Sequence, residues 1–201
     1  MRLKEIYKLA IRMGKIADPR GEEEVENVLK KARKEYDELK EEKRKRFDTE
    51  RLSNPYSDTR ILHGNPELNV KSVLAGIDLE VSEVLLADRL REKGKRIDLL
   101  VSHHPEGKAL AALHEVMHLQ EDVWYRLGVP INIAESLMKD RIMEVERTLA
   151  PVNHNRAVDA ARLLDMAFMC VHTPADNLVT KYLSMYLDEK KPATVGDLME
   201  N

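Results

Sequence analysis

The sequence predicts an α/β protein with a mostly parallel central sheet flanked by helices. Three short apolar runs, over residues 70–77, 97–102 and 167–172, have the length and composition of buried strands. Segments with helical periodicity separate them, and Gly94 falls where the helix after the first run is expected to end. Strands that alternate with helices favour right-handed crossovers and parallel pairing.

The remaining elements follow from the same patterns. Residues 49–69 contain two Asn-Pro pairs and Gly64, so they are expected to form mostly loop with a short strand over 60–63. Thr194 is placed to cap a last helix. The other helices of the main body are expected over residues 81–92, 106–127, 132–149, 155–164 and 178–187.

The first 48 residues predict an N-terminal helical hairpin. Apolar residues share one helical face over 3–16, Asp18-Pro19-Arg20-Gly21 interrupts the pattern, and a second amphipathic stretch follows to Leu39. The charge run over 40–46 contains both signs, which is typical of a solvated helix end. We expect residues 1–48 to be appended to an α/β metal-binding domain of residues 49–201; either this domain is truncated at its C-terminus or its metal site is altered.

The composition excludes several classes of function. The chain has 33 Lys and Arg against 36 Asp and Glu among 201 residues, and aromatic residues make up only 4%. Neither a basic footprint nor a stacking platform for nucleic acid is therefore expected. The sequence has no apolar stretch of the ~18 residues that a membrane span needs, and its single cysteine, Cys170, is expected in the core. These features predict a cytoplasmic protein without membrane contact.

Polar clusters follow the predicted strands. Ser102-His103-His104-Pro105 follows the second strand, and His172-Thr173-Pro174-Ala175-Asp176 follows the third. Carboxyl ends of parallel strands gather at one edge of a sheet, where ligands bind. His172 and Asp176 would share one face of a helical turn. Imidazole and carboxylate groups brought together in this way favour a metal site.

Two features compete with this interpretation. Asp78 follows the first strand and could bind metal or act as a general base, but a capping role at the helix near Val81 is favoured. The sequence His114-Glu115-Val116-Met117-His118 matches a zinc-peptidase motif, with Glu115 as general base and Glu144 or Glu146 as a third ligand. A helix would place His114 about 15 Å from His104, so one metal could not join the two sets. Chance or a supporting role is favoured for this motif.

The ordered signatures resemble those of one family. The strand Val70–Ile77 ending before Asp78, the Ser-His-His-Pro segment and the later His-Thr-x-x-Asp segment are similar to the NGG-interacting-factor-three-like dinuclear metal family, also described as type 2 GTP cyclohydrolase I-like. The resemblance implies that His103 and His104 each bind one of two metal ions, that Asp176 binds one metal or bridges the two, and that His172 lies at the site. It also implies a small nucleotide-like or cyclic substrate and a ring-shaped homo-oligomer.

The chain departs from this family pattern near its C-terminus. Family members usually supply a late His-x-x-x-Glu pair, but no histidine follows His172. Water, His114 or His118, or a neighbouring subunit would then complete the metal coordination. The mixed ligands suit Zn, Mn, Fe or Ni. We expect a dinuclear metal-dependent hydrolase; the alternatives are an oligomeric scaffold protein with a vestigial metal site and a zinc metallopeptidase.

Overall fold

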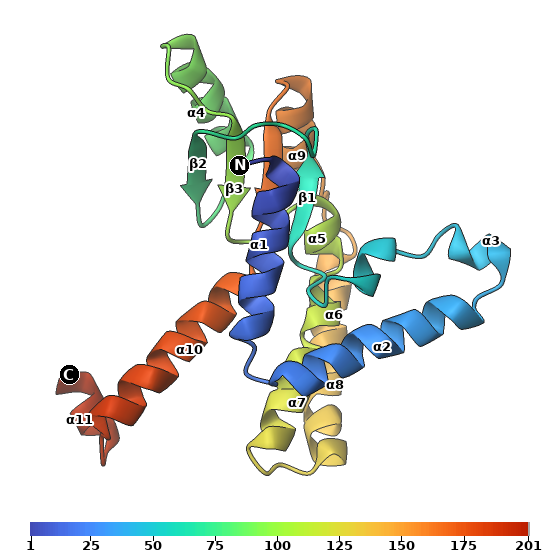
Figure 1. Ribbon diagram of the computed structural model, residues 1–201, viewed down its shortest axis with the longest axis vertical. Helices are drawn as coiled ribbons and strands as arrows, with labels where there is room; N and C mark the ends of the chain where they lie inside the picture. The colour runs from blue at the N-terminus through green and yellow to red at the C-terminus, as the bar shows by residue number, and fades with distance from the viewer. Residues whose placement is uncertain (201) are drawn as a thin grey trace.

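The computed structural model describes residues 1–200 and has an α/β fold with a four-stranded sheet (Figure 1). The predicted fold class is therefore confirmed. The helices and strands, in chain order, are α1 (Leu3–Ile16), α2 (Glu22–Glu38), α3 (Glu41–Arg44), the 3-10 helix η1 (Thr49–Leu52), β1 (Arg60–His63), β2 (Val73–Gly76), α4 (Val81–Glu92), β3 (Leu99–Ser102), α5 (Gly107–Ala111), α6 (Leu113–Val116), α7 (His118–Arg126), α8 (Ile131–Leu149), α9 (Arg156–Leu163), β4 (Ala167–Cys170), α10 (Thr173–Lys190) and α11 (Val195–Glu200).

The sheet has the strand order β1-β4-β3-β2. The strands β2, β3 and β4 are parallel, in a register that aligns Gly76 with Ser102 and Ser102 with Cys170. The edge strand β1 is antiparallel to β4 and aligns Arg60 with Cys170. The carboxyl ends of the three parallel strands, and the residues just before β1, therefore lie along the same edge of the sheet.

Alternating side chains of the strands build a core on each face of the sheet, as the two-residue period of a strand requires. Leu100 and Phe168 point to one face and pack with residues of α4 and α9. Leu99 and Met169 point to the other face and pack with Leu3 at the start of α1. All five side chains are fully buried. The sheet is thus covered by helices on both faces.

The structure corrects several predicted element boundaries, and α10 runs over Thr173–Lys190 where a helix over 178–187 is predicted. The strands β2, β3 and β4 span four residues each, so they are shorter than the predicted runs. The single helix expected over 106–127 is instead three short helices, because the chain turns at Ala112 and again at Met117. The predicted strand over 60–63 and the cap at Thr194, whose hydroxyl accepts a hydrogen bond from the Asp197 amide at 3.2 Å, are both present.

The N-terminal helices take different courses (Figure 1). The helix α1 lies along the sheet, whereas α2 extends outward toward α3. Leu3 of α1 belongs to the second core, so this helix contributes to the main body. The division of the chain at residue 48 stays a prediction. None of the helices formed by the described residues has an apolar stretch that could cross a bilayer.

The helices α1 and α10 approach each other closely at Gly14. A Cβ atom at Gly14 would lie 2.6 Å from Cβ and 2.8 Å from Cα of Pro174, in the first turn of α10. Glycine at this point lets α1 pass directly beside the backbone of α10. The contact holds the beginning of α10 against the body of the protein.

We expect Gly14→Ala to destabilise the protein. Alanine would improve the helix propensity of α1 by up to about 1 kcal/mol, but the overlap with Pro174 would cost roughly 1–3 kcal/mol. Chemical denaturation would measure the difference in the free energy of unfolding. Gly196→Ala is the control, because a Cβ there would meet only Thr194 Oγ1 at 3.5 Å. An unfolding free energy for Gly14→Ala equal to or above that of the unmodified chain would contradict the close contact.

Candidate metal centre

Backbone pairing continues past the end of β3 and positions the two adjacent histidines. The His103 amide donates to the Gly76 carbonyl at 2.9 Å, and the His104 amide donates to the Ile77 carbonyl at the same distance. On the other side, the Val171 amide donates to the Ser102 carbonyl at 2.9 Å. The histidines that follow β3 and β4 are therefore fixed at the carboxyl edge of the sheet.

Three imidazole rings gather at this edge. The ring centroids of His103 and His172 lie 4.7 Å apart, those of His103 and His104 5.2 Å apart, and those of His104 and His172 5.9 Å apart. One potential ligand atom from each histidine lies within 4.8 Å of those of the other two. The structure thus brings together residues from two strand ends that are 68 positions apart in the sequence.

Each ring has an acceptor beside its Nδ1 atom. His104 Nδ1 lies 2.6 Å from Asp78 Oδ1, His172 Nδ1 lies 2.9 Å from Asp58 Oδ2, and His103 Nδ1 lies 3.4 Å from the Val171 carbonyl. A neutral imidazole that donates from Nδ1 carries its lone pair on Nε2. This pairing orients metal-binding histidines in proteins. The three Nε2 atoms are therefore the ligand atoms that the arrangement provides.

Asp176 faces two of these Nε2 atoms. Its carboxylate lies 3.4 Å from His103 Nε2 through Oδ1 and 3.8 Å from His172 Nε2 through Oδ2. Asp176 lies in the first turn of α10, four residues after His172. This is the arrangement that the spacing of the two residues predicts. Its side chain is about half exposed, at 51%, so the carboxylate can turn toward an ion. Asp176 thus supplies oxygen atoms next to the imidazole group.

Asp58 is a site residue that the sequence interpretation missed. Its side chain is fully buried, and Oδ2 accepts hydrogen bonds from His172 Nδ1, from the Thr173 amide at 3.3 Å and from the Thr173 hydroxyl at 2.6 Å. The register of β1 and β4, continued two residues past Arg60 and Cys170, places Asp58 opposite His172. Only the antiparallel pairing of β1 could have indicated this partner, and a single sequence does not specify that pairing.

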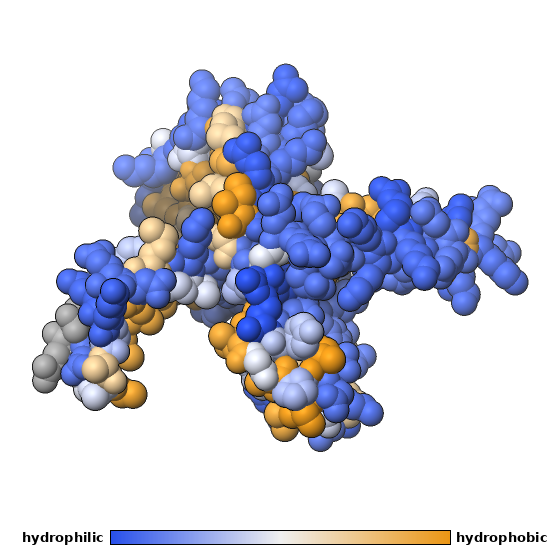
Figure 2. All heavy atoms as spheres, turned by 60° about the horizontal axis from the view of Figure 1, so that its bottom comes forward, coloured by the Kyte–Doolittle hydropathy of each residue, from blue (hydrophilic) through white to orange (hydrophobic). Residues whose placement is uncertain are grey.

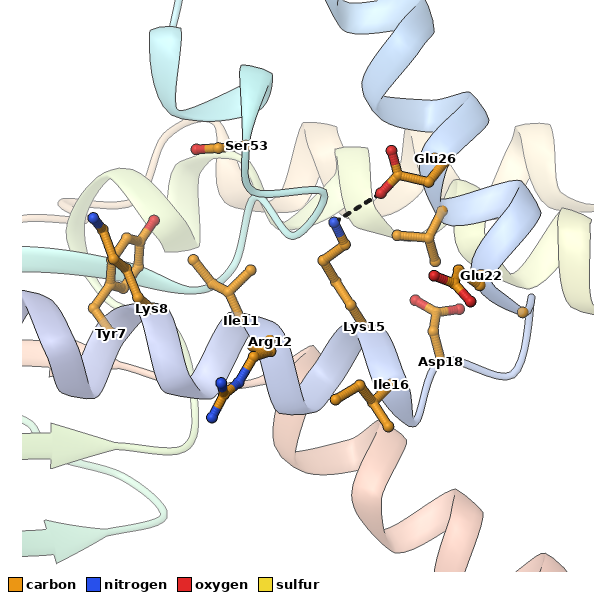
Figure 3. Close-up of a pocket in the computed structure, with 12 residues that line it drawn as sticks. Tyr7, Lys8, Ile11, Arg12, Lys15, Ile16, Asp18, Glu22, Glu26 and Ser53 are labelled. Atoms are coloured by element: carbon orange, nitrogen blue, oxygen red, sulfur yellow. Dashed lines mark hydrogen bonds and ion pairs between the residues drawn. The ribbon is translucent and has the colours of Figure 1, made fainter.

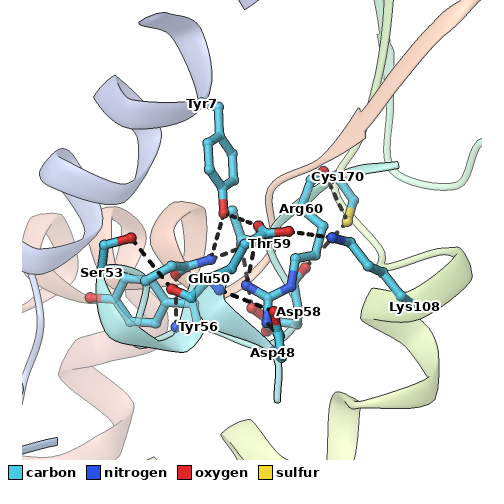
Figure 4. A network of polar contacts seen from close by, with 11 residues as sticks. Tyr7, Asp48, Glu50, Ser53, Tyr56, Asp58, Thr59, Arg60, Lys108 and Cys170 are labelled. Carbon is cyan, nitrogen blue, oxygen red and sulfur yellow. Dashed lines mark hydrogen bonds and ion pairs between the residues drawn. The ribbon is translucent and has the colours of Figure 1, made fainter. Parts of the chain in front are cut away.

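Figure 4 shows the polar network that anchors the segment before β1. Arg60, which is only 2% exposed, donates to Asp48 at 2.6 Å. Tyr7 of α1 donates to Glu50 at 2.5 Å, and Lys108 of α5 also pairs with Glu50. These contacts tie the segment to α1 and α5, and so they hold Asp58 in its position behind His172.

Asp78 does not cap the helix near Val81, which is the role that the sequence favoured for it. The residue at the beginning of α4 is Glu80, which forms a reciprocal capping box with Glu83. Asp78 instead lies beside the His104 ring. The expectation that Asp78 caps α4 is therefore wrong, because the helix begins three residues later and Glu80 satisfies its first amide groups.

The electrostatic environment of His172 favours its charged form. Burial alone would lower the pKa of His172, but the hydrogen bond that His172 donates to Asp58 and the negative charges of Asp58 and Asp176 outweigh this effect and raise that pKa. A cation is thus stabilised at this ring. A divalent metal ion would benefit from the same carboxylates.

The zinc-peptidase motif does not form a comparable cluster. His114 and Glu115 lie on α6, whereas His118 begins α7 and contacts Glu121 Oε2 at 3.0 Å through Nδ1. Among the described residues, the one group of three or more potential ligands with atoms within 4.8 Å consists of His103, His104 and His172. The motif therefore gives the peptidase hypothesis no geometric support.

One cavity lies away from the histidines, between α1 and α2 (Figure 3). Its volume is about 610 Å³, and its lining combines apolar side chains such as Ile11 with the ion pair of Lys15 and Glu26. A smaller cavity of about 370 Å³ is lined by His172 and Asp176 and therefore borders the histidine cluster.

The fold and the site define an α/β protein whose sheet edge carries a histidine and aspartate cluster that can hold a metal ion. The structure is similar to the crystal structure of a NIF3 superfamily protein from Sphaerobacter thermophilus, with 27% sequence identity and a TM-score of 0.60. The similarity covers 67% of this chain and 46% of that protein, so the chain matches less than half of that protein's length. No protein-family model and no curated protein sequence matches the chain. The resemblance to the NIF3-like superfamily that the order of the motifs predicted is therefore confirmed.

Glu106 lies directly beyond the two adjacent histidines and Pro105, and it is mostly buried at 8% exposure. Burial, together with the negative charges of Glu80 and Asp78, raises the pKa of Glu106 to about 7, although Arg156 opposes this shift. The folded protein therefore binds a proton at Glu106 over a pH range in which the unfolded chain has lost it.

We expect Glu106 to make stability fall as the pH rises. Because the pKa of its carboxyl is higher in the folded state, the contribution of Glu106 to stability is fully present below the unfolded pKa of about 4.5 and is lost as the pH rises through about 7. Glu106→Gln should flatten this part of the profile and stabilise the protein at pH 8. Denaturant unfolding from pH 4.5 to 8 in the presence of a chelator measures both profiles. If the free energy of unfolding changed with pH in the same way in both proteins, the raised pKa of Glu106 would be contradicted.

Proposed function

We propose that this protein is a divalent-metal-binding hydrolase that acts on a small molecule. The observation that carries the proposal is the set of three imidazole rings, each of which has an acceptor at Nδ1 and its Nε2 atom available for a metal ion. The Nε2 atoms of His103 and His172 face the carboxylate of Asp176, which supports a metal site at this point.

The chemistry of the donor atoms fits a divalent transition metal. Imidazole nitrogen and carboxylate oxygen suit Zn, Mn, Fe or Ni. We propose two ions, with His103 and His104 as ligands of different ions and Asp176 between them. A bound divalent ion would polarise the substrate and lower the pKa of a coordinated water molecule.

The other side chains of the site position these ligands. Asp58 holds the ring of His172 and would keep its Nε2 atom directed at the ion. Asp78 does the same for His104 from a more exposed position, with 67% of its side chain exposed. Glu115 lines cavities that do not include His172 or Asp176, so the general-base role considered for it has no support. Of the two residues considered as a general base, Asp78 is the one that lies beside the histidine cluster.

Assembly into a homo-oligomer stays a prediction, and exposed apolar side chains are consistent with it. From Leu178 onward α10 leaves the body of the protein, and Val179, Tyr182, Leu183 and Met185 are between 48% and 65% exposed. Figure 2 shows apolar side chains along this helix and at the projecting end of α7 and α8. Contiguous apolar patches of this kind often mark contact surfaces.

We expect saturable zinc or manganese binding that depends on the two adjacent histidines. Isothermal titration of chelator-treated protein would measure it. The double variant His103→Ala/His104→Ala should lose most of the binding, because only His172 and Asp176 would remain as ligands. The double variant His114→Ala/His118→Ala is the matched control and should bind as the unmodified chain does. Unchanged binding in the first variant, or no saturable binding by the unmodified protein, would contradict the proposed site.

Asp58→Asn should weaken metal binding without removing a ligand. An amide cannot hold the His172 ring by a charge-assisted bond, and loss of such a partner typically costs about 10–100-fold in metal affinity. The same titration measures the effect, and circular dichroism checks that the variant is folded. Asp159→Asn, which removes an exposed carboxylate paired with Arg162, serves as the control. An affinity unchanged in a folded Asp58→Asn protein would show that Asp58 does not orient the ligand.

A further inference from the structure

The cavity of about 370 Å³ beside the histidine cluster has two unlike walls. One wall is polar and contains His172 and Asp176. The other is formed by α6 and α7 and contains Leu113, Met117 and Trp124. The sequence predicts a single long helix in this region, and the turn at Met117 instead places parts of two helices around the cavity.

The apolar wall is available to a ligand. Leu113, Met117, Val123 and Trp124 are all partly exposed rather than buried in a core. Covering apolar surface of this kind is favourable in proportion to its area. Tryptophan rings pack well with flat ring systems, and methionine sulfur makes favourable contacts with aromatic rings. The wall therefore suits a planar apolar group.

The size and charge of the cavity further limit the kinds of ligand that it can bind. A volume of about 370 Å³ is near the lower end of the range for small-molecule sites, so it suits a molecule with one ring system. No lysine or arginine is among the described residues that line the cavity. The carboxylate of Asp176 disfavours an anion while the site lacks metal. A negatively charged group would gain its attraction from a bound divalent ion.

We propose that this cavity is the substrate pocket of the metal centre and takes a small molecule made of an aromatic ring joined to an acidic, metal-binding group. The inference rests on the proposed function, because the acidic group is held by the metal ion. The ring lies against Leu113, Met117 and Trp124, and the acidic group points toward His172 and Asp176. The α6–α7 segment thereby selects the substrate, whereas the sheet edge supplies the metal site.

Phenylphosphonate and methylphosphonate test this pocket as a matched pair of probes. Both carry the same acidic group, and only the first carries a ring. Trp124 is the one tryptophan in the chain, so its fluorescence reports directly on the cavity. With zinc-loaded protein, phenylphosphonate should change the Trp124 emission in a saturable way and bind at least tenfold more tightly than methylphosphonate. Without zinc, neither probe should bind.

A substitution in the apolar wall separates the pocket from the metal site. Met117→Asp should reduce the preference for phenylphosphonate at least tenfold while zinc titration by calorimetry is unchanged, and Met117→Leu should keep the preference. Equal binding of the two probes to the zinc-loaded, unmodified protein would overturn the pocket and leave the metal site standing. An unchanged preference for phenylphosphonate in a folded Met117→Asp protein would likewise overturn the pocket without affecting the metal site. Absence of zinc binding by the unmodified protein would overturn the proposed function and the pocket together.

Discussion

The buried carboxylate of Asp58 is the interaction on which the arrangement of the site depends. It has no exposed surface and accepts hydrogen bonds from the His172 ring and from the amide and hydroxyl of Thr173. A buried charge is tolerated only when such partners surround it. The same bonds therefore fix three things at once: the end of β4, the rotation of the His172 ring and the first turn of α10. Asp176 lies in that turn, so its position follows.

Strand register explains why these residues meet. Beyond the last ladder residues, the parallel pairing of β2, β3 and β4 aligns Asp78, His104 and His172, and the antiparallel pairing of β1 adds Asp58 to the same row. From end to end the row reads Asp, His, His and Asp, so two imidazole groups lie between two carboxylates. Each outer aspartate orients the histidine beside it, and His103 completes the cluster one residue earlier.

The sequence alone was sufficient to predict the site residues that follow the parallel strands. A His-His pair after one strand and a His-Thr-x-x-Asp segment after the next predict a meeting point, because parallel strands end at the same edge. Asp58 could not be predicted, since it precedes a short edge strand whose partner and direction depend on tertiary packing. The favoured capping role of Asp78 was wrong for a local reason: Glu80 and Glu83 form the cap. The cavity wall was missed because periodicity over 106–127 does not reveal turns at Ala112 and Met117.

Anomalous scattering from crystals grown with zinc or manganese tests the central claim most directly. Data collected on both sides of the metal absorption edge would locate and identify each ion. We expect a peak within coordination distance, about 2.0–2.2 Å, of a histidine Nε2 atom in the cluster, with Asp176 as an oxygen ligand. A fully occupied peak at His114 and His118 with none at His103, His104 and His172 would contradict it, and so would saturable metal binding in solution without any peak at the sheet edge.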